Sequence, residues 1–277
     1  MSDSESPTLI SRHVVDAWLE PLADGPCGGN LEYDPEFLEM ELSAAGKPET
    51  QFAPAEPPSW PQVRDQAASL LGRTRDLRVG MLWLRASVSL EGMPALAEGL
   101  RLLTGWIDRY WPDVHPALDP DDGDASARLS ALGALVETPG LLGDLRQARL
   151  AHDRRLGGMR VRDVELALGR MPPRADESAP LLGEITNALA DMPEIAALLR
   201  QACSESLQHI DQLQKLVNQY APSDRLIVLK PLREVVRALQ EVASGEQTAA
   251  AGDGAAAPAE AVDAGDAPAA AEGGARR

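Results

Sequence analysis

The spacing of apolar residues predicts helices along almost the whole chain. The clearest run has apolar residues at intervals of four, three and four: Leu77, Met81, Leu84 and Val88. Residues at these intervals lie on one face of an α-helix. The same spacing, bounded by prolines, glycines and capping residues, predicts helices over about 8–20, 34–42, 60–72, 76–90, 94–110, 127–136, 161–169, 180–190, 193–220 and 231–242. Runs of β-branched residues are rare, so the predicted fold class is all-α.

The helices between 60 and 110 are joined by connectors of about four residues, so we expect them to pack as antiparallel neighbours. Composition divides the chain further, because proline and polar residues mark a linker, and alanine, glycine, proline and acids mark a disordered tail. The predicted parts are an N-terminal multi-helix domain over 1–170, a linker over 171–180, a smaller helical extension over 181–243, and a disordered acidic tail or linker over 244–277.

The apolar stripe of the predicted helix 193–220 leaves two alternatives open. The stripe can pack against the helix 231–242 of the same chain, or it can pack against a second copy. Oligomeric state does not follow from the pattern, and self-association stays one of the two expectations.

The formal net charge of −17 narrows the classes of partner. Nucleic-acid binding needs clustered Lys and Arg, and anionic lipid attracts basic segments, so neither partner is expected. Proteins with basic surfaces fit better. The polar, acidic N-terminus has no signal-peptide pattern, and no apolar run reaches the roughly 20 residues of a membrane span. We expect a cytoplasmic protein that reaches the inner face of the cytoplasmic membrane through partners, without inserting.

No motif of catalysis or cofactor binding stands in the sequence. Phosphate-loop, nucleophile-elbow, dinucleotide and zinc-protease patterns are absent, and the four histidines lie in separate segments. Cys27 and Cys203 are expected to be free thiols, since no base stands near Cys27 in the sequence. In the acidic loop 119–124, Gly123 falls one position early for a calcium loop. We therefore predict no catalytic residue, no cofactor and no metal.

Six blocks, in a fixed order over residues 20–170, resemble the N-terminal domain of the TssA/ImpA family of type VI secretion systems. They are Pro21–Phe37, Trp60–Arg64, Leu71–Arg78, Glu91–Leu103 with Tyr110–Pro116, Arg128–Leu132 and Arg162–Gly169. The resemblance rests on motifs at the starts and corners of predicted helices rather than on composition.

Within these blocks six residues are candidates for a structural or partner-contact role: Tyr33, Asp34, Phe37, Trp60, Trp111 and His115. Asp34 is expected to cap a helix. Tyr33 and Phe37, one helical turn apart, are expected to pin the N-terminal loop to the core. Trp111 and His115 are expected to flank a rigid corner that contains prolines. For these positions, packing and direct contact with a partner both stay open.

The resemblance implies a non-enzymatic structural adaptor that assists baseplate docking and the assembly of tube and sheath. The implied partners are baseplate, membrane-complex and tube or sheath proteins. Family members are described as multimers with a ring-forming module at the C-terminus. We find no such module after Tyr220, so the sequence is either a short member or one that stops in a linker before the module.

Two other functions stay open at this point. One is a chaperone or regulator that binds a single secretion component, and the other is a hydrolase built on a similar scaffold. The hydrolase would need a convergent acid and base or a metal triad, for which the sequence offers no candidate.

Overall fold

A computed structural model describes residues 7–175, 177–222 and 225–245. Within these ranges the chain forms eleven α-helices, one short 3-10 turn and no sheet, which confirms the all-α prediction. The helices are α1 (Pro7–Leu19), α2 (Pro35–Ala45), α3 (Trp60–Leu71), α4 (Leu77–Glu91), α5 (Met93–Tyr110), α6 (Ser126–Gly133), α7 (Leu141–Gln147), α8 (Val161–Ala167), α9 (Leu182–Ala190), α10 (Pro193–Tyr220) and α11 (Lys230–Ser244). The tail predicted from residue 244 lies outside the described residues, apart from Ser244 and Gly245.

Side-chain caps fix where α2 and α4 begin. The Asp34 carboxylate accepts a hydrogen bond from the backbone N–H of Glu36 at 2.9 Å at the start of α2. The Asp76 carboxylate accepts one from the backbone N–H of Arg78 at 2.8 Å at the start of α4. Each bond satisfies an N–H that has no partner within the helix, so the chain turns into a helix at these points.

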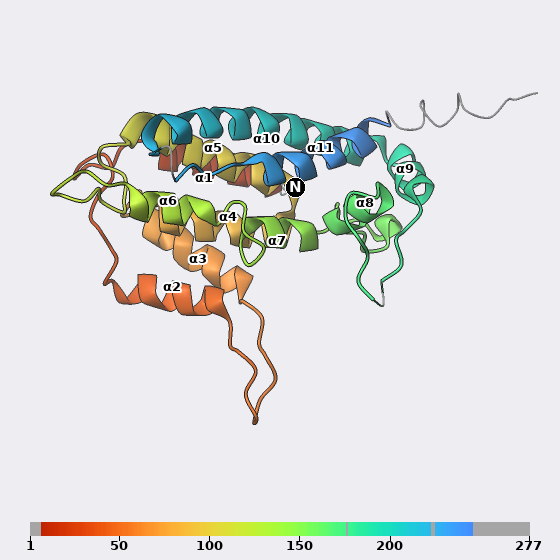
Figure 1. The fold of residues 1–277 in the computed structure, drawn as a ribbon, viewed down its shortest axis with the longest axis horizontal. Helices are drawn as coiled ribbons and strands as arrows, with labels where there is room; N and C mark the ends of the chain where they lie inside the picture. The colour runs from red at the N-terminus through yellow and green to blue at the C-terminus, as the bar shows by residue number, and fades with distance from the viewer. Residues whose placement is uncertain (1–6, 176, 223–224, 246–277) are drawn as a thin grey trace, which may run out of the picture.

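The helices α2, α3, α4, α5, α10 and α11 pack one against the next in that order (Figure 1). The long helix α10 packs against both α5 and α11, α7 packs against α4, and α8 packs against α11. The helices after residue 180 therefore lie against the N-terminal helices, and α10 packs against α5 and α11 of the same chain. A domain boundary at 171–180 stays a prediction.

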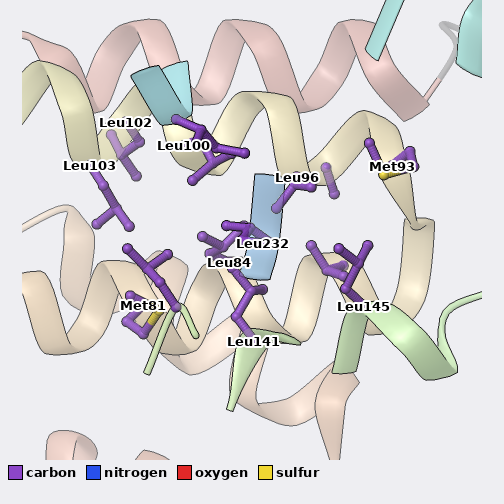
Figure 2. Close-up of a cluster of buried hydrophobic side chains, with 14 of the residues drawn as sticks. Met81, Leu84, Met93, Leu96, Leu100, Leu102, Leu103, Leu141, Leu145 and Leu232 are labelled. Atoms are coloured by element: carbon purple, nitrogen blue, oxygen red, sulfur yellow. The ribbon is translucent and has the colours of Figure 1, made fainter. Parts of the chain in front are cut away.

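The centre of the core is a cluster of leucine and methionine side chains contributed by α4, α5, α7 and α11 (Figure 2). Its labelled members are all buried: Met81, Leu84, Met93, Leu96, Leu100, Leu102, Leu103, Leu141, Leu145 and Leu232. Each contributes roughly 2 kcal/mol by leaving water. A Cβ on Gly99 of α5 would lie 2.3 Å from Cδ1 of Leu84, so glycine there lets α5 approach α4 closely.

Buried polar bonds fasten α1 to α5. The indole N–H of Trp106 donates to the carbonyl of Trp18 at 2.9 Å, and the Tyr110 hydroxyl donates to the carbonyl of Leu19 at the same distance. These bonds fall at the last turn of α1, where carbonyls have no partner within the helix. They fix the direction in which the chain leaves α1.

A buried carboxylate extends this connection to α10. Glu98 of α5 accepts from Arg12 Nε of α1 at 3.0 Å and from Arg101 Nη2 at 2.7 Å. Arg12 also reaches Glu205 of α10 at 3.3 Å. The charged groups therefore join three helices at one point.

Candidate functional site

Three loops meet at one end of the helix array, and their backbones bond to one another. The backbone N–H of Arg75 donates to the carbonyl of Cys27 at 2.8 Å. The N–H of His115 donates to the carbonyl of Arg75 at 3.0 Å, and the N–H of Leu77 donates to the carbonyl of His115 at 2.8 Å. We call the joined segments 26–30, 73–77 and 111–116 the loop corner.

Two side chains reinforce the loop corner. The Thr74 hydroxyl donates to the carbonyl of Gly29 at 2.8 Å, and His115 Nε2 lies 3.0 Å from the carbonyl oxygen of Gly28. A carbonyl only accepts, so Nε2 of His115 carries the proton in this bond. His115 thus holds the loop after Cys27 in place from the opposite side of the corner.

Arg128 of α6 is fully buried beneath the loop corner and donates to three backbone carbonyls. Its partners are the carbonyls of Pro116 at 2.7 Å, Trp111 and Pro112. The guanidinium carbon also lies 4.8 Å from the centroid of the Trp111 ring, a favourable cation–π position. Burial lowers the pKa of Arg128 from its ordinary value. The cation is therefore a fixed internal link between α6 and the loop 111–116.

Arg75 plays the same part on the other side of the loop corner. It is buried, and its guanidinium donates to the carbonyls of Leu71 at 2.6 Å, Thr74 at 3.1 Å and Glu20 at 3.0 Å. Burial lowers the pKa of Arg75 as well. Both arginines donate their hydrogen bonds to backbone carbonyls of the chain itself. The bonds of Arg75 join the end of α1 to the turn before α4.

An aromatic stack joins the loop corner to the C-terminal end of α10. The rings of Trp111 and Tyr220 lie 4.2 Å apart between centroids at an interplanar angle of 11°. Trp111 is thus covered by Tyr220 on one face and contacted by Arg128. The stack connects the segment 111–116 with the last residue of α10, more than 100 positions later in the chain.

Two cavities lie outside the loop corner. A cavity of about 400 Å³ is lined by Arg146, Glu165, Arg170, Pro231 and Glu234, but Arg146 and Glu165 pair with each other at 2.8 Å. A second cavity, of about 390 Å³, is lined mainly by apolar side chains of α4, α5, α10 and the segment 150–152, together with Glu91 and His152. Among the residues that the structure describes, no three His, Cys, Asp or Glu side chains gather as metal ligands would.

Comparison with known proteins identifies the family. A family model described as ImpA, N-terminal, type VI secretion system, matches residues 19–137. The chain is 38% identical over 235 residues to the type VI secretion system component TssA1 of Pseudomonas aeruginosa, which covers 83% of this chain and 67% of that protein. This chain belongs to the TssA family of type VI secretion system components.

A solved structure shares the TssA fold seen here. It is the N-terminal domain, including the conserved ImpA_N region, of the TssA component from Burkholderia cenocepacia. The match has a TM-score of 0.63 at 22% sequence identity and covers 88% of this chain and 96% of that domain.

In the described ranges, no helix combines the length and apolar character needed to cross a membrane.

The TssA motif residues occupy different places around the first helices. Phe37 of α2 is buried, and the Arg78 guanidinium carbon lies 4.9 Å from its ring centroid. Trp60 opens α3, half-buried, with the Arg85 guanidinium carbon 5.2 Å from its ring. Tyr33 is 86% exposed, so the prediction that it pins the N-terminal loop to the core is wrong.

Asp34 caps α2, as predicted, and has a second bond. Its other carboxylate oxygen accepts from Arg73 at 2.8 Å, and Arg73 also reaches Glu36 at 2.7 Å. The hydrogen bond from Arg73 lowers the pKa of Asp34, with the backbone N–H of Glu36 adding to the effect. Asp34 thus ties the start of α2 to the turn before α4. Trp111 and His115 lie in the loop corner, while a role in partner contact stays a prediction for all six candidates.

Cys27 lies inside the loop corner as a neutral thiol. Burial, with Asp113 nearby, raises its pKa to about 11, against the opposing effect of Arg75 and Arg128. Cys203 of α10 is also buried, and burial raises its pKa to about 12. A nucleophilic cysteine needs a lowered pKa, so neither thiol suits covalent catalysis.

Thiol chemistry offers a test of this environment. At pH 8 a thiol reagent such as Ellman's reagent is expected to modify neither cysteine of the native chain and both after unfolding in denaturant. The folded chain holds both thiol protons more tightly than the unfolded chain does, because burial raises both pKa values above the ordinary 9.0. Stability should therefore be unaffected by these groups below about pH 9 and fall as the pH rises from 9 toward 11 and 12. A Cys203→Ala variant should show a shallower alkaline decline, and equal slopes would contradict the assignment.

The stack on Trp111 offers a second test. Replacing Tyr220 with alanine should lower the free energy of unfolding by about 2 kcal/mol, because half-buried ring surface and a ring–ring contact are lost. Tyr33→Ala is the matched control: its exposed ring should change stability by less than about 0.5 kcal/mol. Both values come from guanidinium unfolding followed by tryptophan fluorescence. Equal losses in the two variants would mean that the stack does not hold α10.

Proposed function

We propose that the chain acts as a non-enzymatic adaptor of the type VI secretion system, assisting baseplate docking and the assembly of tube and sheath. Its partners would be baseplate, membrane-complex and tube or sheath proteins, met in the cytoplasm. Membership of the TssA family supports the secretion role. The two free, buried thiols are in keeping with a reducing compartment.

The observation that carries the proposal is how the motif side chains are used. Arg75, Arg128 and His115 bond to backbone carbonyls of the loop corner, so their polar groups stabilise the fold. Cys27 stands among them as a neutral thiol. A fold that spends its polar side chains on internal loops, and leaves apolar ones exposed on α2, suits a binding surface rather than a reaction site.

Pull-down and fluorescence localisation in the native host test the proposal. An adaptor should recover several secretion components, and a fluorescent fusion should form discrete foci at sites of assembly. Recovery of one component with diffuse fluorescence would favour the chaperone or regulator. Turnover by the purified chain that disappears on Cys27→Ser or on replacing a histidine would favour the hydrolase and overturn the proposal.

A further inference from the structure

The helix α2 has a second apolar face that stays exposed among the residues that the structure describes. Phe37 and Met40 point inward and are buried against α3. Leu38 and Leu42 are 46% and 73% exposed and, at a spacing of four residues, lie on one face. At about 100° per residue, this face is roughly opposite the buried one, and Ala45 extends it by one turn. An exposed apolar stripe on an edge helix typically marks a contact surface.

The segment 46–59 between α2 and α3, which we call the arm, adds to this face. The backbones of Lys47 and Glu56 exchange two hydrogen bonds of 2.9 Å, and Thr50 pairs with Ala53 nearer the tip. These bonds hold Phe52 at the tip, where its ring is 89% exposed. In Figure 1 α2 forms the lower edge of the helix array, and the arm extends beyond that edge. The stripe and the arm thus lie on the same side of the molecule.

Acidic side chains flank the apolar stripe. Residues 32–56 contain seven acids and one lysine. Glu39 and Glu41 fall on either side of the stripe by helical position, and Glu49 lies on the arm. Within the described residues, none of these three makes a salt bridge, whereas Arg73 neutralises Asp34 and Glu36. The surface therefore offers acidic groups outside salt bridges around the exposed leucines; burial raises the pKa of Glu41, and the nearby Arg78 acts on it in the opposite direction.

The charge around the stripe indicates which kind of partner binds this face. A second copy carries the same net charge of −17 and would place acids against acids. The chain's own stretch 246–277 holds six acids, two arginines and a single larger aliphatic residue, Val262, so it matches neither the charge nor the apolar stripe. A helix with leucine-like residues at i and i+4, flanked by Lys or Arg, complements both.

We propose that the outer face of α2, together with the arm, binds a cationic amphipathic helix of another protein. The inference rests on the proposed function in that the helix belongs to another component of the secretion machine. Leu38, Leu42 and Phe52 supply the apolar contacts. Glu39, Glu41 and Glu49 pair with the flanking cations and set the orientation.

A designed peptide tests the surface with the full chain. The probe is a helical peptide of about 18 residues with leucines on one face and lysines on the other, and its partner control replaces every lysine with glutamate. Fluorescence anisotropy at about 0.15 M salt measures binding. The lysine peptide should bind and the glutamate peptide should not.

Matched variants then locate the binding. Leu38→Ser with Leu42→Ser should weaken the lysine peptide about tenfold or more, whereas Leu181→Ser, at a leucine 69% exposed on another part of the chain, should leave it unchanged. Glu39→Lys with Glu41→Lys should weaken it and flatten its dependence on salt. The replaced leucines are exposed to solvent, so the thermal midpoint of the leucine variants should stay that of the parent chain.

Three results would overturn the proposal: equal weakening by Leu181→Ser, equal affinity for both peptides, or self-association that the Leu38 and Leu42 variant abolishes. Fluorescent foci in the host distinguish a failure of this binding surface from a failure of the proposed adaptor function. If the Leu38→Ser, Leu42→Ser variant still forms foci and still recovers its partners, the adaptor function is retained and the proposed role of this surface is wrong. A parent chain that forms no foci counts against the adaptor function, whatever the peptides show.

Discussion

Replacing Arg128 with methionine is expected to lower the free energy of unfolding by about 4 kcal/mol. The methionine fills a similar volume but donates no hydrogen bond, so the carbonyls of Trp111, Pro112 and Pro116 lose their donor. A buried acceptor left without a partner costs about 1–3 kcal/mol. Removing a buried charge offsets part of this loss, but the polar partners remain, so the exchange is not the neutral replacement of a whole ion pair.

Guanidinium unfolding of the parent chain and two variants measures the effect. Arg237→Met is the control, because that side chain is exposed on α11 and its loss should change stability by about 0.5 kcal/mol or less. Arg128→Lys keeps the charge but lacks the planar fork, so it should fall between the parent and the methionine variant. A loss below about 1 kcal/mol for Arg128→Met would mean that water replaces the guanidinium beneath the loop corner.

The apolar stripes made the helices predictable. Leu77, Met81, Leu84 and Val88 are all buried on α4, as their spacing indicates. Periodicity reports which face of a helix is covered, but not what covers it. The stripe on α10 therefore allows packing against α11 or against a second copy, and the structure shows that α5 and α11 both pack against α10.

Tyr33 shows a limit of spacing arguments. Its distance of four residues from Phe37 places the two rings together only if both stand in one helix. Asp34 is the cap and α2 begins at Pro35, so Tyr33 precedes the helix and its ring faces solvent. The cap was predicted correctly, and it is the same residue that separates Tyr33 from the helix.

The two buried arginines were missed for a different reason. Arg75 and Arg128 stand in the motif blocks, but an arginine in a sequence reads as a surface residue unless something shows that it is buried. Arg128 had one such signal, since it lies one turn before Leu132 on the inward face of a short helix. Its acceptors are backbone carbonyls, which every residue carries, so the sequence could not indicate the partners.

Replacing Gly28 with alanine is expected to lower the free energy of unfolding by about 3 kcal/mol. Gly28 has a φ of +64°, where a side chain is strained. A Cβ there would also lie 2.2 Å from the backbone carbonyl oxygen of Arg73, which belongs to the loop corner and cannot rotate away. The loop must shift, and the shift disturbs the bond between Gly28 and His115.

Gly29→Ala is a control one residue away. A Cβ at Gly29 meets nothing within 4 Å among the described residues, so that variant should change stability by about 0.5 kcal/mol or less. Guanidinium unfolding gives both values, and the rate at which Ellman's reagent modifies Cys27 reports the loop itself. Gly28→Ala should expose the Cys27 thiol and speed its modification. The reason is that the Cys27 carbonyl accepts one of the hydrogen bonds that hold the loop corner together. Two variants with the same stability and the same thiol reactivity would show that the loop corner adapts to a side chain at either position, and that its close packing does not depend on glycine.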